Sequence, residues 1–201
     1  MVGILLAAGE SSRMGRPKAL LPWGPSSTLL EHQVRQLVEG GCDHVFVVSG
    51  AVTEVEPLAE AAGATAVRND RWREGRASST RAGAAAAPGD TEIVIVASVD
   101  QPTTAAIVGQ LIQCVRDNPA VIYVPVQDGK RGHPVALPGK FLPELREVQE
   151  ETHGLHDLVE AYPPSEVDFE DAIVLADINS PEDYTRWHEH AFPGSQPAAV
   201  G

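Results

Sequence analysis

The sequence has few cysteines, no long apolar run and a shortage of positive charge, and each shortage argues against a class of protein. Cys42 and Cys114 form no closely spaced pair, so we expect reduced thiols rather than a disulfide framework or a zinc site. No apolar run approaches the roughly 20 residues that cross a bilayer. The chain enters an apolar segment almost at once, which predicts a cytoplasmic protein with no signal peptide and no membrane partner.

The net charge of −13, from 15 Lys and Arg against 28 Asp and Glu, argues against nucleic acid as a partner. The cations are unevenly spread, because eight of them lie in two short segments, 13–18 and 68–81. Such clusters in an acidic chain indicate local anion-binding sites. The length of 201 residues fits one domain, which we expect over 1–191, followed by a flexible tail over 192–201 that is rich in Pro, Gly and Ala.

The most informative segment is the opening VGILLAAGESSRMGRPKALLP, which spans residues 2–22. Its first residues form an uninterrupted apolar run, which is typical of a parallel strand covered on both faces. The loop that follows is rich in small residues and carries three cations. Small residues let a backbone wrap closely around phosphate oxygens, and nearby cations offset the charge of the ligand. The segment therefore predicts a polyphosphate-binding loop. Its cations are Arg13, Arg16 and Lys18.

Two better-known phosphate loops do not fit this segment. A P-loop needs a Lys directly after its second glycine and then Ser or Thr, but Gly15 is followed by Arg-Pro-Lys-Ala. A dinucleotide fingerprint needs G-x-G-x-x-G at the start of a helix, and here only Gly9 and Gly15 are present.

The rest of the chain alternates between apolar strands and helices. We expect helices over 28–39, 52–62, 78–87 and 104–116, and we expect strands over 44–49, 64–68, 92–98, 121–125 and 132–137. This alternation predicts a doubly wound, three-layer α/β fold with a mostly parallel sheet. Ligands of such sheets bind beyond the carboxyl ends of the strands. Asp100 directly follows the strand at 92–98, so we expect it to lie beside the Gly9 loop.

The motif LAAG-x-S-x-R-M-G-x-x-K-x-L-L-P resembles the signature of the MobA-like NTP transferases, and within them the molybdenum cofactor cytidylyltransferases. Further matches follow in the family's order: Asn69-x-x-Trp72-x-x-Gly75, Asp100-Gln101-Pro102, Gly132-His133-Pro134 and the segment from Asp177 to Asp183. The resemblance implies a Rossmann-like nucleotide-diphospho-sugar transferase fold. It also implies transfer of a nucleoside monophosphate to a phosphorylated acceptor, with release of pyrophosphate.

The resemblance assigns roles to individual residues. Arg13 would bind the β- and γ-phosphates, and Lys18 would neutralise charge at the α-phosphate. The nucleotide-binding residues that it implies are Leu6, Ala7, Ala8, Gly9, Ser11, Ser12, Gly15 and Ser79. The acceptor-binding residues that it implies are Asn69, Trp72 and His133, although Trp72 could equally belong to the core and His133 could merely pack.

A carboxylate that faces a triphosphate needs a cation between them, so Asp100 is a candidate Mg²⁺ ligand. The segment Asp177-Ile178-Asn179 offers a second ligand, and alternation along an extended segment would send both polar side chains to one face. Relatives place Asp or Asn where this chain has Asn179, and Asp177 stays as the alternative. Ser180-Pro181-Glu182-Asp183 is typical of a helix N-terminus, with Ser180 as the N-cap.

The leading interpretation is a Mg²⁺-dependent transfer of CMP from CTP to molybdopterin, with a molybdoenzyme or its chaperone as a possible recipient of the product. CTP is favoured because cytidylyl-transferring relatives carry Ala at the position of Ala8, where guanylyl-transferring ones carry Gly. The alternatives are GTP as the donor, another phosphorylated acceptor such as a sugar or alditol phosphate, and a non-catalytic nucleotide- or cofactor-binding module of the same fold.

Overall fold

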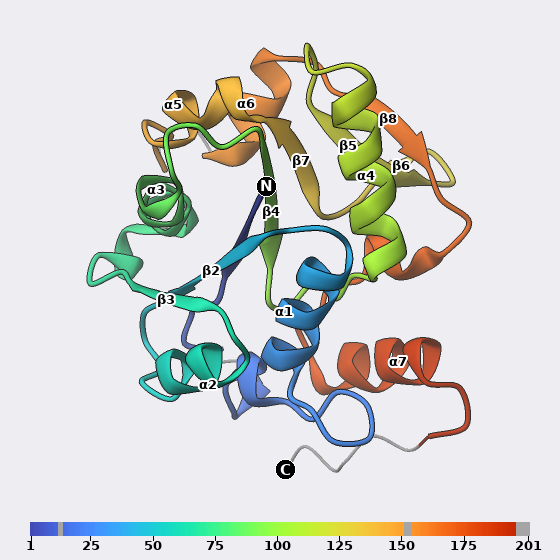
Figure 1. Cartoon of the computed structure of the whole chain (residues 1–201). Coiled ribbons are helices and arrows are strands. Elements are labelled where there is room, and N and C mark those ends of the chain that lie inside the picture. Colours follow the sequence, from blue (N-terminus) through green and yellow to red (C-terminus); the bar gives the residue numbers. More distant parts are fainter. Residues whose placement is uncertain (12–13, 151–153, 196–201) are drawn as a thin grey trace.

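An eight-stranded sheet lies between two layers of helices in the computed structural model, which describes residues 1–11, 14–150 and 154–195 (Figure 1). The strands are β1 (Val2–Leu6), β2 (His44–Ser49), β3 (Thr65–Arg68), β4 (Ile93–Ser98), β5 (Tyr123–Gln127), β6 (Lys130–Arg131), β7 (Val135–Pro138) and β8 (Ser165–Asp168). Their order is β3-β2-β1-β4-β7-β5-β6, and β8 pairs with β5. The predicted α/β class with a mostly parallel sheet is confirmed.

The strand predicted at 132–137 departs from the parallel pattern. It forms β7, which runs antiparallel to both β4 and β5. Only a short loop separates the hairpin of β5 and β6 from β7. Two consecutive strands that run parallel need a crossover connection of a dozen or more residues, so this short loop cannot make β7 parallel to β5. The reversal brings the first residues of β7, next to His133, to the edge where β4 ends.

The helices are α1 (Leu29–Glu39), α2 (Val55–Ala61), α3 (Arg76–Ala86), α4 (Ala105–Asp117), α5 (Leu142–Leu145), α6 (Leu155–Ala161) and α7 (Pro181–Ala191). Short 3₁₀ turns connect them: η2 (Lys18–Leu20), η3 (Trp72–Glu74), η4 (Gly139–Phe141) and η5 (Ala172–Leu175). The sequence analysis did not anticipate α5, α6 or β8. Each is short, and β8 alternates between exposed and half-buried residues at the sheet's edge.

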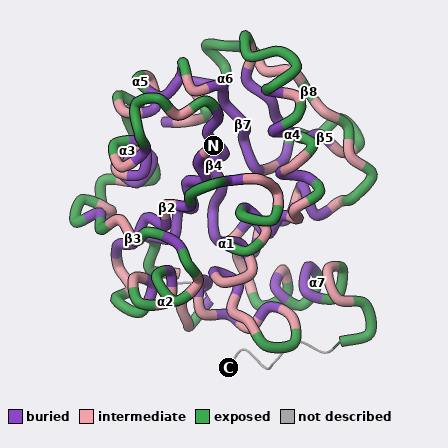
Figure 2. The backbone as a smooth tube through the Cα atoms, in the orientation of Figure 1, coloured by how far each residue is buried: buried purple, intermediate pink, exposed green. Residues whose placement is uncertain are grey.

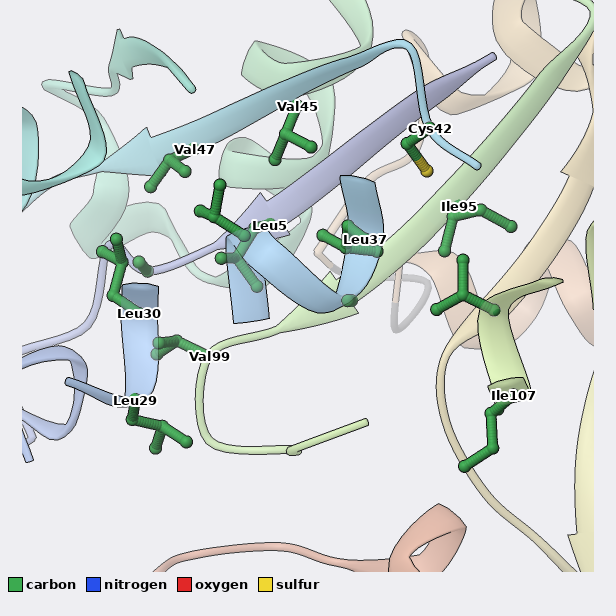
Figure 3. Close-up of a cluster of buried hydrophobic side chains, with 14 of the residues drawn as sticks. Leu5, Leu29, Leu30, Leu37, Cys42, Val45, Val47, Ile95, Val99 and Ile107 are labelled. Atoms are coloured by element: carbon green, nitrogen blue, oxygen red, sulfur yellow. The ribbon is translucent and has the colours of Figure 1, made fainter. Parts of the chain in front are cut away.

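Two apolar clusters fill the space between the sheet and its helices. Alternate residues of β1 serve opposite faces, with Leu5 in the cluster under α1, α2 and α4 and Ile4 in the cluster under α3, α5 and α6. Figure 3 shows Leu29, Leu30 and Leu37 of α1 facing strand residues of the first cluster. The central strands are buried, and exposed backbone lies on turns and outer helix faces (Figure 2). Burial on both faces explains why β1 and β4 read as unbroken apolar runs.

Helix caps fix the segments that flank the sheet's carboxyl edge. Thr28 and Glu31 form a capping box at α1. At α7 the predicted cap is confirmed, because the Ser180 hydroxyl accepts from the backbone N–H of Asp183 at 3.1 Å and Pro181 is the first helical residue. Asn179 therefore has a fixed place directly before the helix.

The end of the described chain packs on the body of the molecule. Phe192 follows α7, and its ring centroid lies 5.9 Å from that of Trp23. The predicted tail begins at this packed residue, and its last part, 196–201, lies outside the described residues. In the described part of the chain, no helix has both the length and the apolar character to cross a membrane.

Candidate active site

The loops that follow β1 and β4 open a cavity of about 240 Å³ at the carboxyl edge of the sheet. The two strands are parallel neighbours, so their carboxyl ends meet at this edge as the sequence predicts. The predicted nucleotide-binding residues that line the cavity are Leu6, Ala7, Ala8, Gly9, Ser11 and Ser79. Lys18 and Asp100 line it as well. Arg76 lines it too, so small residues, two cations and one carboxylate face a single space.

A single ammonium group connects three segments that are far apart in the sequence. Lys18 Nζ donates to Asp100 Oδ2 at 3.0 Å and to Asn179 Oδ1 at 2.9 Å. The Lys18 and Asp100 side chains are only 11% and 16% exposed, so this ion pair is largely screened from water. Charge-assisted hydrogen bonds gain strength in such surroundings.

The loop holds Lys18 by its backbone as well. The Lys18 backbone N–H donates to Ser11 Oγ at 3.0 Å. Ser11 has φ of 56°, a left-handed conformation that only a tight turn imposes on a residue with a side chain. Pro17 fixes the extended backbone directly before η2. Lys18 therefore enters the site from a braced backbone.

Gln33 of α1 secures the loop that carries Asp100. It is completely buried, and its amide donates to the carbonyl oxygens of Ser98 at 3.1 Å and Gln101 at 2.7 Å. Its amide oxygen accepts from the backbone N–H of Thr103 at 3.1 Å. The sequence analysis missed this role. The available signal was position 33 itself, which shares a helix face with Leu29 and Leu37 at i−4 and i+4.

The two candidate second ligands occupy different places. The backbone N–H of Ile178 donates to the Asp100 carbonyl at 2.9 Å, which runs the 177–179 segment past the β4 loop. Asn179 shares the Lys18 ammonium with Asp100. Asp177, like Asp100, lies close enough to His133 for its charge to oppose the lowering of the His133 pKa by burial. The arrangement groups Asn179 with Asp100 and directs our metal proposal toward that pair.

The donor set of this pair fits a divalent cation. One carboxylate oxygen and one amide oxygen converge on a single positive charge, the Lys18 ammonium. The ammonium thus marks a place where two oxygen ligands already face a cation. Mg²⁺ takes oxygen ligands, one or two of them from protein carboxylates, and completes its shell with phosphate and water. Among the described residues, no group of three or more His, Cys, Asp and Glu side chains is placed to hold a metal ion, so the proposed pair would rely on phosphate and water for its other ligands.

A second cavity, of about 490 Å³, adjoins the first. Leu6, Arg76 and Ser98 line both cavities and form their common boundary. Branched apolar residues line much of the second cavity: Val96, Val124, Val135, Leu155 and Val159. Charged and titratable side chains line it as well: Arg76, Arg131, His133, Glu150, His156 and Glu160.

His133 stands at the polar end of the second cavity. Gln101 Nε2 lies 2.7 Å from His133 Nε2, so with the amide donating, this ring nitrogen accepts and the ring is neutral. Burial lowers the pKa of His133, and the nearby Arg76 lowers it further. Gly132 permits this placement, because a Cβ there would lie 2.1 Å from the Val174 carbonyl oxygen.

Comparison with known proteins places the chain in a family. The model of the MobA-like NTP transferase domain matches residues 3–167. The chain belongs to the MobA-like NTP transferase family.

Three curated relatives carry different names. The chain is similar to nicotine blue oxidoreductase of Paenarthrobacter nicotinovorans, at 36% identity over 72% of this chain and 74% of the relative. It is similar to molybdenum cofactor cytidylyltransferase of Escherichia coli, at 28% identity over 90% and 92%. It is also similar to a probable molybdenum cofactor guanylyltransferase of Mycolicibacterium paratuberculosis, at 31% identity over 91% and 92%.

Solved structures agree with this placement. Rv0371c of Mycobacterium tuberculosis superposes with a TM-score of 0.78 at 27% identity, covering 94% of this chain and 96% of the other. The same protein in complex with manganese gives a TM-score of 0.74 at 25% identity, over 94% and 97%.

The remaining predicted residues of this MobA-like transferase take different places. Trp72, an acceptor-binding candidate, lines the first cavity with the aliphatic Val52 and Val55. Asn69 lines neither cavity: it is buried, and its amide donates to the hydroxyls of Ser78 at 2.9 Å and Ser79 at 3.0 Å. Its direct contacts therefore hold the Trp72 loop against α3.

Two of the predicted residues, Ser12 and Arg13, lie outside the described residues. Gly15 is described and has φ of 68°, but it does not line the cavity. Gly50, which sequence analysis did not single out, lies against two residues that line the cavity, Ala8 and Trp72. A Cβ at Gly50 would lie 2.8 Å from Ala8 Cβ and 2.9 Å from Trp72 Cβ, so only glycine lets these two residues approach.

Proposed function

We propose that this MobA-like NTP transferase moves CMP from CTP to the phosphate of molybdopterin or its molybdenum form and releases pyrophosphate. The observation that carries the proposal is the convergence of Asp100 and Asn179 on one cation beside the small-residue loop. The full-length similarity to a molybdenum cofactor cytidylyltransferase supports the choice of substrates. We further propose that the reaction takes place in the cytoplasm and that the product passes to a molybdoenzyme or its chaperone.

The nucleotide would occupy the first cavity. Its phosphates would lie along the backbone of the Gly9 loop and near Lys18, with Arg13 on the β- and γ-phosphates. Its base and ribose would lie against Trp72 and Val52. Ala8 narrows this wall by one methyl group, which favours a pyrimidine over a purine. One methyl in a pocket decides only about 1–3 kcal/mol, so the preference for CTP over GTP should be moderate.

The acceptor would occupy the second cavity, with its ring among the valines and its phosphate at the boundary between the cavities. Arg76 is the cation that lines both cavities, and Gln101 and His133 supply neutral hydrogen-bonding groups beside it. A phosphate at this boundary would face the α-phosphate of the nucleotide. Positioning of two reactants in this way supplies much of the rate in phosphoryl-group chemistry.

In the reaction, an oxygen of the acceptor phosphate attacks the α-phosphorus of CTP. A new P–O bond forms, and the bond from the α-phosphorus to the bridging oxygen breaks, with its electron pair leaving on pyrophosphate. Negative charge grows at the α-phosphate and the leaving group, where Lys18 and Arg13 would neutralise it. Mg²⁺, held by Asp100 and Asn179, would neutralise and orient the phosphates.

A nucleotide panel tests the proposal. Pyrophosphate release is measured with CTP, GTP, ATP and UTP in turn, with molybdopterin present or omitted and Mg²⁺ present or chelated. We expect release with CTP, dependent on both molybdopterin and Mg²⁺. Release with GTP alone would keep the mechanism and overturn the base preference. Release only with a sugar or alditol phosphate would replace the acceptor, and binding without turnover would favour the non-catalytic module.

A redox activity is the second candidate, because the relative at 36% identity is named an oxidoreductase. The same preparation is therefore assayed for NAD(P)H oxidation with a panel of flat heteroaromatic electron acceptors, by loss of absorbance at 340 nm. NAD(P)H oxidation without pyrophosphate release would decide for the redox candidate.

A further inference from the structure

We propose that in the free protein the Lys18 ammonium occupies the metal site. A metal ion can enter this site only when Lys18 moves to the phosphates of the nucleotide. This inference rests on the metal site of the proposed function. It adds that the free protein keeps the site closed to a metal ion alone. Metal binding and nucleotide binding then become one coupled event.

The same ammonium engages one oxygen of each proposed metal ligand. Asp100 Oδ2 and Asn179 Oδ1 each accept a hydrogen bond from the same Nζ, at 3.0 and 2.9 Å. Lys18 is itself only 9% exposed. The ammonium thus supplies the charge that the carboxylate needs, in a place where little water could replace it.

The second step is mutual exclusion. A Mg²⁺ ion that bridges these oxygens would lie about 2.0–2.1 Å from each. The ammonium occupies the space between the same two atoms, so both cations could fit only at a separation where they repel strongly. A metal ion can therefore bridge Asp100 and Asn179 only after Lys18 Nζ has left them.

The third step concerns where the ammonium can go. The charged side chains among the described residues that line the first cavity are Lys18, Arg76 and Asp100, so the cavity offers no second carboxylate. Lys18 would leave its partner for a space that already contains a cation. A bound triphosphate reverses this balance, because it brings several negative charges within reach of the flexible lysine chain.

Coupling follows from these three steps. A metal ion alone must displace the ammonium without compensation and should bind weakly. A metal ion that arrives with CTP gives the ammonium a new anionic partner at the α-phosphate, where the transition state needs it. The displaced residue is then delivered to its catalytic position by the binding event itself.

Mn²⁺ binding measured by electron paramagnetic resonance tests the exchange without any need for turnover. The titrations use the full chain in four forms: wild type, Lys18→Met, Lys18→Met/Asp100→Asn and Lys130→Met. Lys130 is an exposed lysine on β6, so its variant controls for the loss of one positive charge. Each form is titrated alone and with a non-hydrolysable CTP analogue.

We expect Lys18→Met to bind Mn²⁺ at least tenfold more tightly than wild type when no nucleotide is present. Lys130→Met should match wild type, and the double variant should lose the gain. With the CTP analogue, the advantage of Lys18→Met should disappear, because the wild-type lysine then has the phosphates as partners. If Lys18→Met fails to fold, Lys18→Gln, which keeps a donor for Asp100 without the charge, takes its place.

The outcomes separate this inference from the metal site itself. If Lys18→Met gains no affinity while Asp100→Asn abolishes Mn²⁺ binding in the presence of the analogue, the exchange is overturned and the metal site stands. If the gain persists in the double variant, or if Asp100→Asn leaves Mn²⁺ binding with the analogue unchanged, the ion binds elsewhere. Either of those results overturns both the exchange and the metal site.

Discussion

The side-chain amide of Gln33 donates to the backbone carbonyl of Gln101 at 2.7 Å and so ties α1 to the residue directly after Asp100. Two more hydrogen bonds, to Ser98 and Thr103, extend this tie across the whole turn that follows β4. The position of the candidate metal ligand thus depends on a buried side chain from another element. Its removal should affect stability and activity together.

Gln33→Leu should lower the free energy of unfolding by about 2–4 kcal/mol, because three buried backbone groups lose their partner. Urea unfolding followed by circular dichroism measures this change. Gln113→Leu is the matched control, since Gln113 lies exposed on α4 and bonds only Asp117 in the described structure. A loss below 0.5 kcal/mol for Gln33→Leu would contradict the proposed support of the Asp100 turn.

Lys18→Met should lower kcat by about 10²–10³ while the dissociation constant for CTP rises far less, since its role lies at the transition state. Steady-state pyrophosphate release gives kcat, and equilibrium binding of a CTP analogue gives the affinity. Lys130→Met again serves as the control for charge. An unchanged kcat would remove Lys18 from the mechanism.

Ala8→Gly should shift the preference between CTP and GTP toward GTP by about tenfold in kcat/KM, within the range expected for one methyl group. Ala8 lines the cavity and lies against Gly50, so removal of its methyl group widens the cavity locally. Competition between the two nucleotides in one reaction measures the ratio directly. A ratio that does not move would show that other residues read the base.

Arg76→Met should raise the KM for the phosphorylated acceptor by about 10–100-fold and that for CTP by less than threefold. Arg76 lines both cavities, which puts it where the acceptor phosphate would lie. Arg116→Met, at the opposite edge of the sheet on α4, is the control. An equal rise for both substrates would assign Arg76 to the nucleotide instead.

The stability of the fold should decrease as the pH falls from 6.5 to 4. Burial lowers the pKa of His32 to about 4, from 6.5 when unfolded, so the unfolded chain binds more protons between these values. The shift corresponds to roughly 3 kcal/mol lost across this window and fully retained above pH 6.5. His32→Gln, which can still donate to Thr103, should flatten part of the profile in urea unfolding at several pH values. His44→Gln, at the exposed first residue of β2, is the control. Identical profiles for the His32 and His44 variants would contradict the assignment.

Local patterns carried most of what the sequence predicted. The apolar runs of β1 and β4 placed the Gly9 loop and Asp100 at one edge, because strands buried on both faces are parallel neighbours in such folds. The Ser180 cap and its proline fixed the start of α7. These features depend on residues close together in the chain, so they can be read from it.

The features that escaped prediction depend on residues far apart. β7 pairs with β4, some forty residues earlier, and this pairing brings His133 to the site. Gly50 lets Ala8 and Trp72 approach each other, although the three residues lie in separate segments of the chain. Gln33 looks like an ordinary polar helix residue until the turn that it supports is in place. No short-range pattern encodes these contacts.

The most direct test of nucleotidyl transfer is the fate of the phosphorus atoms of CTP. The protein is incubated with molybdopterin, Mg²⁺ and CTP that carries ³²P at either the α- or the γ-position. The products are then separated by chromatography. The account predicts that label enters the acceptor from the α-position alone and that the γ-label leaves as pyrophosphate. Label transferred from the γ-position, or no label in the acceptor from either, would contradict it.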